Sequence, residues 1–193
     1  MQPIDFSRFT LKETYFDNHS LRHGIGHTYR VMVHVLKIGE RVKLNHEIAL
    51  AFCGAFIHDM ARRHDGYCTR HGAWATRRKL PLFEQLFRAH DVDDAGMETI
   101  GLAVSNHSLH EEIDPAHPDY KTVALLKDAD ALDRIRICKG CLDPEYLRFP
   151  ESHELIAFAE ELFFKTDEMR IESFDHMLDI AGEIETQFGE KQP

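Results

Sequence analysis

An adjacent histidine and aspartate, His58 and Asp59, end the longest apolar run of the chain. The run, from Ile48 to Ile57, is apolar around its whole helical circumference, which predicts a helix buried on most sides. Burying an ionised carboxylate beside an imidazole at the end of such a helix is unfavourable unless a cation or several hydrogen bonds compensate. We therefore expect His58 and Asp59 to belong to a functional site, with a purely structural His-Asp pair as the alternative.

A second candidate, His27, lies at the edge of an apolar stripe on another predicted helix. The stripe consists of Val31, Val35, Ile38 and Val42. Arg30 flanks His27 on this helix, and His34 lies on the same side as a weaker candidate. A lone inward histidine is more often a hydrogen-bonded core residue than a ligand, so that alternative stays open for both.

Three acids fall in one late helix, and their spacing separates their roles. The buried arc of this helix is formed by Leu125, Leu126, Ala129, Leu132 and Ile137. At about 100° per residue, Asp130 and Asp133 lie on or beside this arc, whereas Asp128 points about 160° away from Asp130. We predict Asp130 to be a metal ligand, Asp133 to be an acid that supports the ligands, and Asp128 to be solvated. Capping of a backbone group, or pairing with Arg134 or Arg136, is the alternative for the first two.

The chain has 14 histidines, an excess that points to metal binding or acid-base chemistry. His107 ends a predicted helix and shares its buried face with Ile100, Ala103 and Val104. His71 begins a helix directly after the charged, aperiodic segment from Arg62 to Arg70, which we predict to be a loop. Four further histidines lie in polar or helix-end contexts and are predicted to be surface residues: His90, His110, His117 and His153.

The periodicity predicts an all-α fold. Apolar residues recur at three- and four-residue spacing, and strand-like alternation is absent. The predicted helices are His27 to Leu44, His46 to Asp59, His71 to Leu80, Leu82 to His90, Ala95 to His107, Tyr120 to Ile137, His153 to Lys165 and Phe174 to Phe188, with Pro81, Pro115, Pro118, Pro144 and Pro150 between them. We expect a single compact domain of about eight helices over residues 1–193, with a core of about 23–137 on which C-terminal helices in 151–188 pack.

The charge balance excludes two classes of partner. A net charge of −10 leaves no surplus of basic groups for general nucleic-acid binding or for an anionic membrane. The longest apolar run is about half of the ~20 residues that span a bilayer. The first ten residues contain Asp5 and no apolar signal core, so we expect a cytoplasmic protein.

The four cysteines, Cys53, Cys68, Cys138 and Cys141, are too few and too irregularly spaced for a disulfide scaffold, so we expect reduced thiols. Cys138 and Cys141 have the spacing of a zinc knuckle or a redox pair. Neither a second such pair nor a thioredoxin-like strand pattern accompanies them, so we assign them no metal.

Taken together, the motifs resemble the HD-domain superfamily over roughly His27 to Arg134. His27, with Arg30-Val31 after it, resembles the first motif of that superfamily, and His58-Asp59 its signature pair. Asp130, in an Ala-Asp-x-Leu context, resembles the last motif. His71 and His107 match the two additional histidines of members that hold two metals. Arg62 occupies the basic position three residues after the signature aspartate.

The resemblance implies a small metal-dependent phosphohydrolase. Its divalent metal, expected as two ions of Mn, Fe, Co, Ni or Zn, would be held by His27, His58, Asp59, His71, His107 and Asp130. Asp59 would bridge the ions, and a shared hydroxide would attack phosphorus while Arg30 and Arg62 bind phosphate oxygens and Asp133 supports the ligands. The expected substrate is a small phosphorylated molecule such as a nucleotide.

Departures from the better-known subfamilies narrow this expectation. The acidic pair that follows the signature in guanosine tetraphosphate hydrolases is missing, and Asp65-Gly66-Tyr67 differs from the Gly-Tyr-Pro element of cyclic di-guanylate phosphodiesterases. The late segment from Leu142 to Arg148 is more similar to small phosphohydrolases of the superfamily. Two alternatives remain: a diiron oxygenase with the same six ligands, and a non-catalytic helical domain stabilised by metal.

Overall fold

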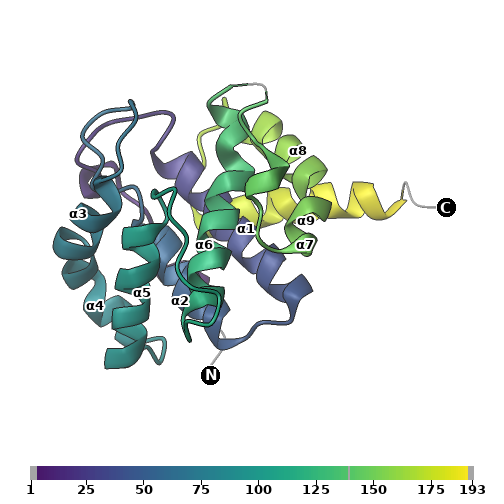
Figure 1. The fold of residues 1–193 in the computed structure, drawn as a ribbon. Helices are drawn as coiled ribbons and strands as arrows, with labels where there is room; N and C mark the ends of the chain where they lie inside the picture. The colour runs from purple at the N-terminus through teal and green to yellow at the C-terminus, as the bar shows by residue number, and fades with distance from the viewer. Residues whose placement is uncertain (1–3, 139, 191–193) are drawn as a thin grey trace.

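The computed structural model describes residues 4–138 and 140–190, and within these ranges every regular element is a helix (Figure 1). The α-helices are α1 (Ile25–Val42), α2 (His46–Ile57), α3 (His71–Arg78), α4 (Leu80–Arg88), α5 (Asp94–Asn106), α6 (Tyr120–Leu132), α7 (Pro150–Glu154), α8 (Ile156–Thr166) and α9 (Phe174–Glu190). Short 3-10 helices are η1 (Phe6–Arg8), η2 (Glu13–Tyr15), η3 (Asp133–Arg136) and η4 (Pro144–Tyr146). The all-α prediction is confirmed.

Each predicted helix has a counterpart, and the differences lie at helix ends. The short helix α7 was not predicted, and the last predicted turn of α6 is the 3-10 helix η3. Pro81 and Pro150 were expected between helices but occupy the first turns of α4 and α7. Proline is tolerated there because the first backbone N–H groups of a helix have no partner within it.

Helix α2 forms the centre of the fold. It contacts α1, α5 and α6, and every residue from Ala49 to Ile57 is buried. On α2, the ring of Phe52 makes edge-to-face contacts with the rings of Phe9 and Phe174, whose centroids lie 4.9 and 5.2 Å from its own. These contacts join the N-terminal segment and α9 to the core and place the end of α2, with His58 and Asp59, in the interior.

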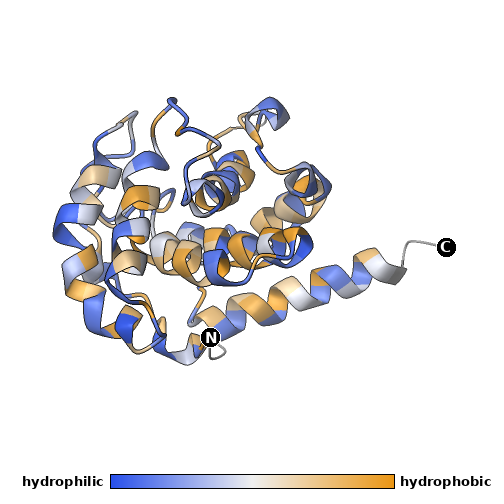
Figure 2. Ribbon diagram, turned by 60° about the horizontal axis from the view of Figure 1, so that its bottom comes forward, coloured by the Kyte–Doolittle hydropathy of each residue, from blue (hydrophilic) through white to orange (hydrophobic). Residues whose placement is uncertain are grey.

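The C-terminal helices pack on the core of the domain. Helix α8 contacts α1 and η3, while α9 contacts α1, α8 and η1. Figure 2 shows the last turns of α9 extending past the other helices. None of the described helices is long and apolar enough to cross a membrane.

The prediction that Asp128 is solvated is wrong. Its side chain is 0% exposed and accepts hydrogen bonds from the backbone N–H groups of Arg148 and Phe149, from the Ser152 hydroxyl and from the Arg148 guanidinium, at 2.8 to 3.0 Å. The helical-wheel argument assumed one buried face, but the segment that leads into α7 covers the opposite face of α6. Asp128 therefore ties this segment to α6.

We expect Asp128→Ala to lower the free energy of unfolding by about 3 kcal/mol or more, because several buried donors lose their acceptor. Urea denaturation measures the change. The matched control is Asp179→Ala, since Asp179 is an exposed aspartate on α9; that change is expected to stay within about 0.5 kcal/mol. Equal stability of the two variants would contradict the role of Asp128.

Three histidines outside the predicted ligand set are buried: His23, His34 and His90. His90 was expected at the surface, but its ring packs against Phe9 at a centroid distance of 5.0 Å and its Nδ1 donates to the Leu86 carbonyl at 2.8 Å. The other three predicted surface histidines are exposed: His110, His117 and His153. His34 is fully buried, and neither ring nitrogen has a hydrogen-bond partner among the described residues.

Burial lowers the pKa of His34 from 6.5 to about 4. Between these values the unfolded chain binds a proton that the folded protein does not, so the stability falls as the pH drops from about 6.5 towards 4. A shift of this size corresponds to about 3 kcal/mol. We expect His34→Leu to reduce the pH dependence of the unfolding free energy by that order, measured by urea denaturation from pH 7 to pH 4. Parallel curves for wild type and variant would contradict it.

The expectation of reduced thiols fails for one pair. Cys138 and Cys141 form a disulfide, whereas Cys53 is buried and free and Cys68 is partly exposed and free. Burial raises the pKa of the Cys53 thiol, which keeps it protonated and unreactive. The disulfide lies just beyond η3, in the segment that connects α6 with η4.

Candidate metal centre

The six predicted ligands converge in the interior from five places in the fold. His27 comes from α1, His58 and Asp59 from the end of α2, His71 from the start of α3, His107 from the end of α5 and Asp130 from α6. The ligand atoms of five of them, with that of His23, form three groups whose members lie within 4.8 Å of one another: His23, His27 and Asp59; His27, His58 and Asp130; and His58, Asp59 and His107. His71 belongs to none of these groups, but its Nε2 lies 3.0 Å from Asp59 Oδ1. Such groups are able to hold a metal ion.

Hydrogen bonds fix the orientation of all four imidazoles. In each ring, Nδ1 faces an oxygen that only accepts: Asp133 Oδ2 for His27 at 2.7 Å, the Ala55 carbonyl for His58 at 2.7 Å, the Cys68 carbonyl for His71 at 2.8 Å and the Val104 carbonyl for His107 at 2.7 Å. Each Nδ1 therefore carries the hydrogen. In a neutral imidazole this leaves Nε2 as a bare lone pair, which is the state that binds a metal.

These bare nitrogens face one another in two pairs. His27 Nε2 lies 3.1 Å from His58 Nε2, and His71 Nε2 lies 2.9 Å from His107 Nε2. Two lone pairs cannot hydrogen-bond to each other. Two nitrogens that share one ion at about 2.1 Å each, with angles of about 90 to 109°, lie about 3.0 to 3.4 Å apart. The spacing of the nitrogens therefore fits residues that could hold a metal ion.

Asp59 lies between the two histidine pairs. Its Oδ2 is 3.4 Å from His27 Nε2 and 3.8 Å from His58 Nε2, whereas its Oδ1 is 3.0 Å from His71 Nε2 and 3.7 Å from His107 Nε2. Oδ1 is buried and has no hydrogen-bond partner among the described residues. One carboxylate thus offers one oxygen to each pair, the arrangement expected of a bridging ligand.

Asp130 completes the first pair. Its Oδ1 lies 3.4 Å from His27 Nε2 and 4.0 Å from His58 Nε2. Burial alone would raise the pKa of this carboxyl, but the neighbouring Arg136 guanidinium and His27 hold the pKa well below its usual range. Asp130 is therefore ionised and ready to coordinate a cation.

The surroundings of His58 and Asp59 also shift their pKa values. Burial lowers the pKa of His58 from 6.5 to about 3, so this imidazole is neutral near pH 7. Burial alone would raise the pKa of Asp59, but the imidazoles of His58, His107 and His23 hold it well below its ordinary value. A neutral imidazole next to an ionised carboxylate is the donor set that a divalent transition metal prefers.

Close packing of two helices brings His71 to His107. A Cβ atom on Gly72 would lie 2.2 Å from the Val104 carbonyl oxygen, so only glycine allows α3 to approach α5 this closely. His71 immediately precedes this contact, and His107 follows Val104 by three residues. The approach of the two backbones therefore sets the distance between the two rings.

Asp133 and Arg30 support His27 from behind. Arg30 donates from Nε to Asp133 Oδ1 at 2.6 Å and from Nη2 to Oδ2 at 3.0 Å, and Oδ2 also receives His27 Nδ1–H. Burial alone would raise the pKa of Asp133, but the charge of Arg30 holds it far below its usual value. The supporting role predicted for Asp133 agrees with this geometry. Arg30 is 3% exposed and does not line the cavity described below, so its expected contact with phosphate is corrected to a support of Asp133.

A cavity of about 480 Å³ opens onto the centre. Its walls include Asp59, His71, His107 and Asp130, together with Arg62. The Arg62 Nη2 donates to the Gly66 carbonyl at 2.9 Å, while Nη1 lies 3.3 Å from His71 Nε2 and 3.7 Å from Asp59 Oδ1. Arg62 therefore occupies the position next to the centre that was predicted for it.

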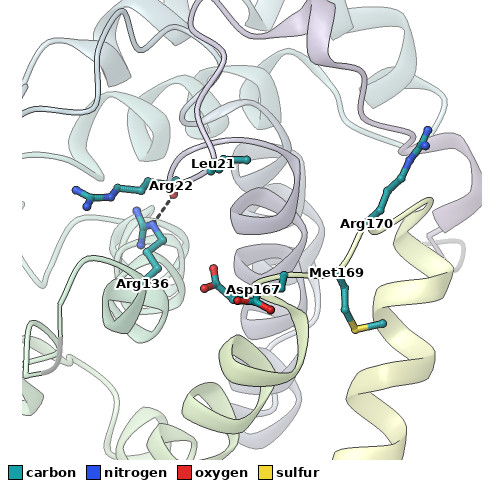
Figure 3. A pocket seen from close by; sticks show the side chains of 7 residues that line it. Leu21, Arg22, Arg136, Asp167, Met169 and Arg170 are labelled. Carbon is teal, nitrogen blue, oxygen red and sulfur yellow. Dashed lines mark hydrogen bonds between the residues drawn. The ribbon is translucent and has the colours of Figure 1, made fainter.

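His23 was not predicted as a residue of this site, and Arg136 was named only as an alternative partner of Asp130 and Asp133. His23 donates from Nδ1 to Asp59 Oδ2 at 2.7 Å, and Arg136 lies 3.5 Å from Asp130 Oδ1. Arg136 also donates from Nε to the Arg22 carbonyl at 2.8 Å, in the wall of a second, open cavity (Figure 3). His23 precedes α1 and has no helical period; its spacing of four residues from His27 was the one available signal.

Comparisons with protein-family models, with curated proteins and with solved structures give no significant match to this chain.

We expect about two divalent metals per chain in protein loaded with Mn, Fe, Co, Ni or Zn, and about one in the double variant His71→Ala, His107→Ala, because one nitrogen pair is lost. Elemental analysis after gel filtration measures the content. His110→Ala is the matched control, since His110 lines the cavity but is exposed and outside the cluster. One metal per chain in all three proteins would contradict the dinuclear arrangement.

Proposed function

We propose that the protein is a metal-dependent hydrolase of phosphate esters or anhydrides. The observation that supports this most strongly is the shared carboxylate of Asp59, which offers one oxygen to each of two imidazole pairs at the floor of a cavity. Carboxylate-bridged metal pairs are a recurrent solution for phosphoryl hydrolysis. The order of His27, His58-Asp59 and Asp130 along the chain adds the resemblance to HD-domain phosphohydrolases.

Each candidate ligand has a proposed role in such a site. His27, His58 and Asp130 would hold one ion, and His71 and His107 the other, with Asp59 between them. When bound, the ions would acidify a water molecule and neutralise charge on phosphate oxygens. Because the Nδ1 atoms are hydrogen-bonded to fixed oxygens, the imidazoles keep their orientation as the charge at the centre changes.

Arg62 is the residue best placed to bind the phosphate. Its guanidinium lies in the cavity wall within 4 Å of Asp59, and its Nε has no hydrogen-bond partner among the described residues. A planar guanidinium matches the geometry of two phosphate oxygens. Further cations in the cavity wall are Lys127, Arg134, Arg136 and Arg148. The wall also holds five acids, Asp59, Asp65, Glu112, Asp130 and Asp143, so its formal charge is balanced. Divalent ions held at the centre would make the cavity positive and would favour an anionic substrate.

The size and walls of the cavity favour a small substrate. A volume of about 480 Å³ lies within the usual range of pockets for small molecules. The candidate ligands in its wall, such as Asp59 and His71, are buried, so a long polymer has little access to them. We therefore propose a phosphorylated small molecule such as a nucleotide.

We expect metal-loaded protein to release inorganic phosphate from at least one nucleotide or small phosphate ester. Asp59→Asn should abolish this release, and Arg62→Ala should lower kcat/KM by about 10- to 100-fold, the usual effect of losing a charged hydrogen bond. Arg63→Ala is the matched control: this neighbouring guanidinium stacks on Trp74 at 4.6 Å and does not line the cavity. A phosphate-release screen with metal analysis of the same samples tests the proposal.

Protein that carries two metals but releases phosphate from no ester would contradict the hydrolase. Metal-dependent melting without turnover would then favour a structural centre. Loss of activity in Arg63→Ala equal to that in Arg62→Ala would contradict the role of Arg62.

A further inference from the structure

The disulfide between Cys138 and Cys141 lies in one wall of the metal-facing cavity. The stretch from Asp130 to Arg148 contributes Asp130, Arg134, Arg136, Ile137, Cys141, Asp143, Tyr146 and Arg148 to the lining. This wall carries a metal ligand at one end and several cations along its length. The disulfide closes a four-residue loop in its middle.

Both ends of this wall are fixed by buried charges. At one end, Arg30 and His27 hold Asp133 in η3, and at the other, Asp128 holds the backbone at Arg148. Between these anchors two local hydrogen bonds restrain the described residues. Cys141 N–H donates to the Cys138 carbonyl at 3.1 Å, and Arg134 Nε donates to the Cys141 carbonyl at 3.2 Å. Cys138 and Arg134 are exposed, so water competes with this last bond. The disulfide is therefore the strongest restraint on the middle of the wall.

The two sulfurs are accessible to a reductant. Cys138 is exposed and Cys141 is partly exposed, in contrast to the buried Cys53. A separation of three residues is the spacing found in thiol pairs that cycle between the disulfide and the dithiol. Neither sulfur belongs to the metal centre.

We propose that Cys138 and Cys141 are a redox-modification site, and that opening their disulfide loosens the cavity wall and weakens anion binding. A dithiol reductant supplies the electrons. One of its thiolates attacks a protein sulfur to form a mixed disulfide, and its second thiolate displaces that bond. The protein thus gains two electrons and two protons, so that Cys138 and Cys141 become thiols, and the reductant becomes a disulfide.

This device controls the cavity and leaves the metal centre intact. Asp130 and Asp133 precede the disulfide and are held by groups on other helices. Opening the disulfide therefore lets the chain between residues 137 and 147 become less ordered, without removing a candidate ligand. The inference concerns regulation of the site for which hydrolysis is proposed, but its test uses inorganic phosphate as a bound anion and requires no turnover.

The first measurement follows the thiols. Folded, metal-loaded protein is equilibrated with mixtures of reduced and oxidised dithiothreitol, then alkylated and analysed by peptide mass. We expect Cys138 and Cys141 to gain and lose two labels together, while Cys53 stays unlabelled until the protein unfolds. Free thiols at both positions under oxidising conditions, or a pair that resists reduction in the folded protein, would overturn the proposal.

The second measurement compares amide hydrogen exchange in the cavity wall and phosphate affinity before and after reduction. On reduction, amide hydrogen exchange between residues 137 and 147 should accelerate about tenfold. The dissociation constant of inorganic phosphate should rise about threefold or more, while the metal content stays within about 10%. The Cys138→Ser, Cys141→Ser double variant should behave like reduced wild type and ignore dithiothreitol. Cys68→Ser is the matched control, since it removes the free thiol that lines the same cavity and should keep the response.

Unchanged exchange and unchanged phosphate affinity on reduction would overturn the switch, whether or not the protein hydrolyses an ester. A response that persists in the double variant and disappears in Cys68→Ser would assign the effect to Cys68 and overturn it as well. If phosphate release fails while the exchange and affinity respond, the proposed hydrolase fails and the redox site stands.

Discussion

The carboxylate of Asp59 carries its negative charge at the end of a helix whose residues from Ala49 to Ile57 are all buried. His23 donates one hydrogen bond to its Oδ2, but Oδ1 has no hydrogen-bond partner among the described residues. The imidazoles of His58, His71 and His107 face Asp59 with Nε2 and have already given their Nδ1 hydrogen to other oxygens. In such a place an uncompensated charge is strongly unfavourable. The converging ends of α1, α3, α5 and α6 therefore make physical sense as a cage for cations, and the stability of the core depends on how this charge is balanced.

Around this centre the polar groups form successive layers. His27 receives its orientation from Asp133, Asp133 from Arg30, and Arg30 also donates to the Thr166 hydroxyl on α8 at 3.3 Å. A chain of hydrogen bonds thus connects the metal-facing nitrogen with a C-terminal helix. Because each buried group in it satisfies the next, removing one member leaves its neighbour without a partner. This explains why a helix that contributes no ligand still bears on the geometry of the centre.

The helices and much of the candidate site could be predicted because their signals are periodic. His27, His107 and Asp130 lie on or beside apolar arcs, and His58-Asp59 ends an apolar run. Other features depend on which segment covers which face, and periodicity carries no information about that. Asp128 is buried because the chain returns over the outer side of α6 after η4, and Arg30 points to Asp133 instead of the cavity. His23 lies before the first turn of α1, where a helical wheel does not apply, and the pairing of Cys138 with Cys141 depends on a turn that the spacing alone did not decide.

Because α3 approaches α5 closely at Gly72, the two imidazole pairs can form at different times during synthesis of the chain. His71 and His107 are 36 residues apart, whereas His27 and its supporting Asp133 are 106 residues apart. Closing the shorter loop loses less chain entropy, and all its members leave the ribosome before α6 does. His71, His107 and Asp59 can therefore come together on the nascent chain, whereas His27 and His58 meet Asp130 only after α6 has emerged. The order in which the fold closes is thus also the order in which the two groups of candidate ligands come together.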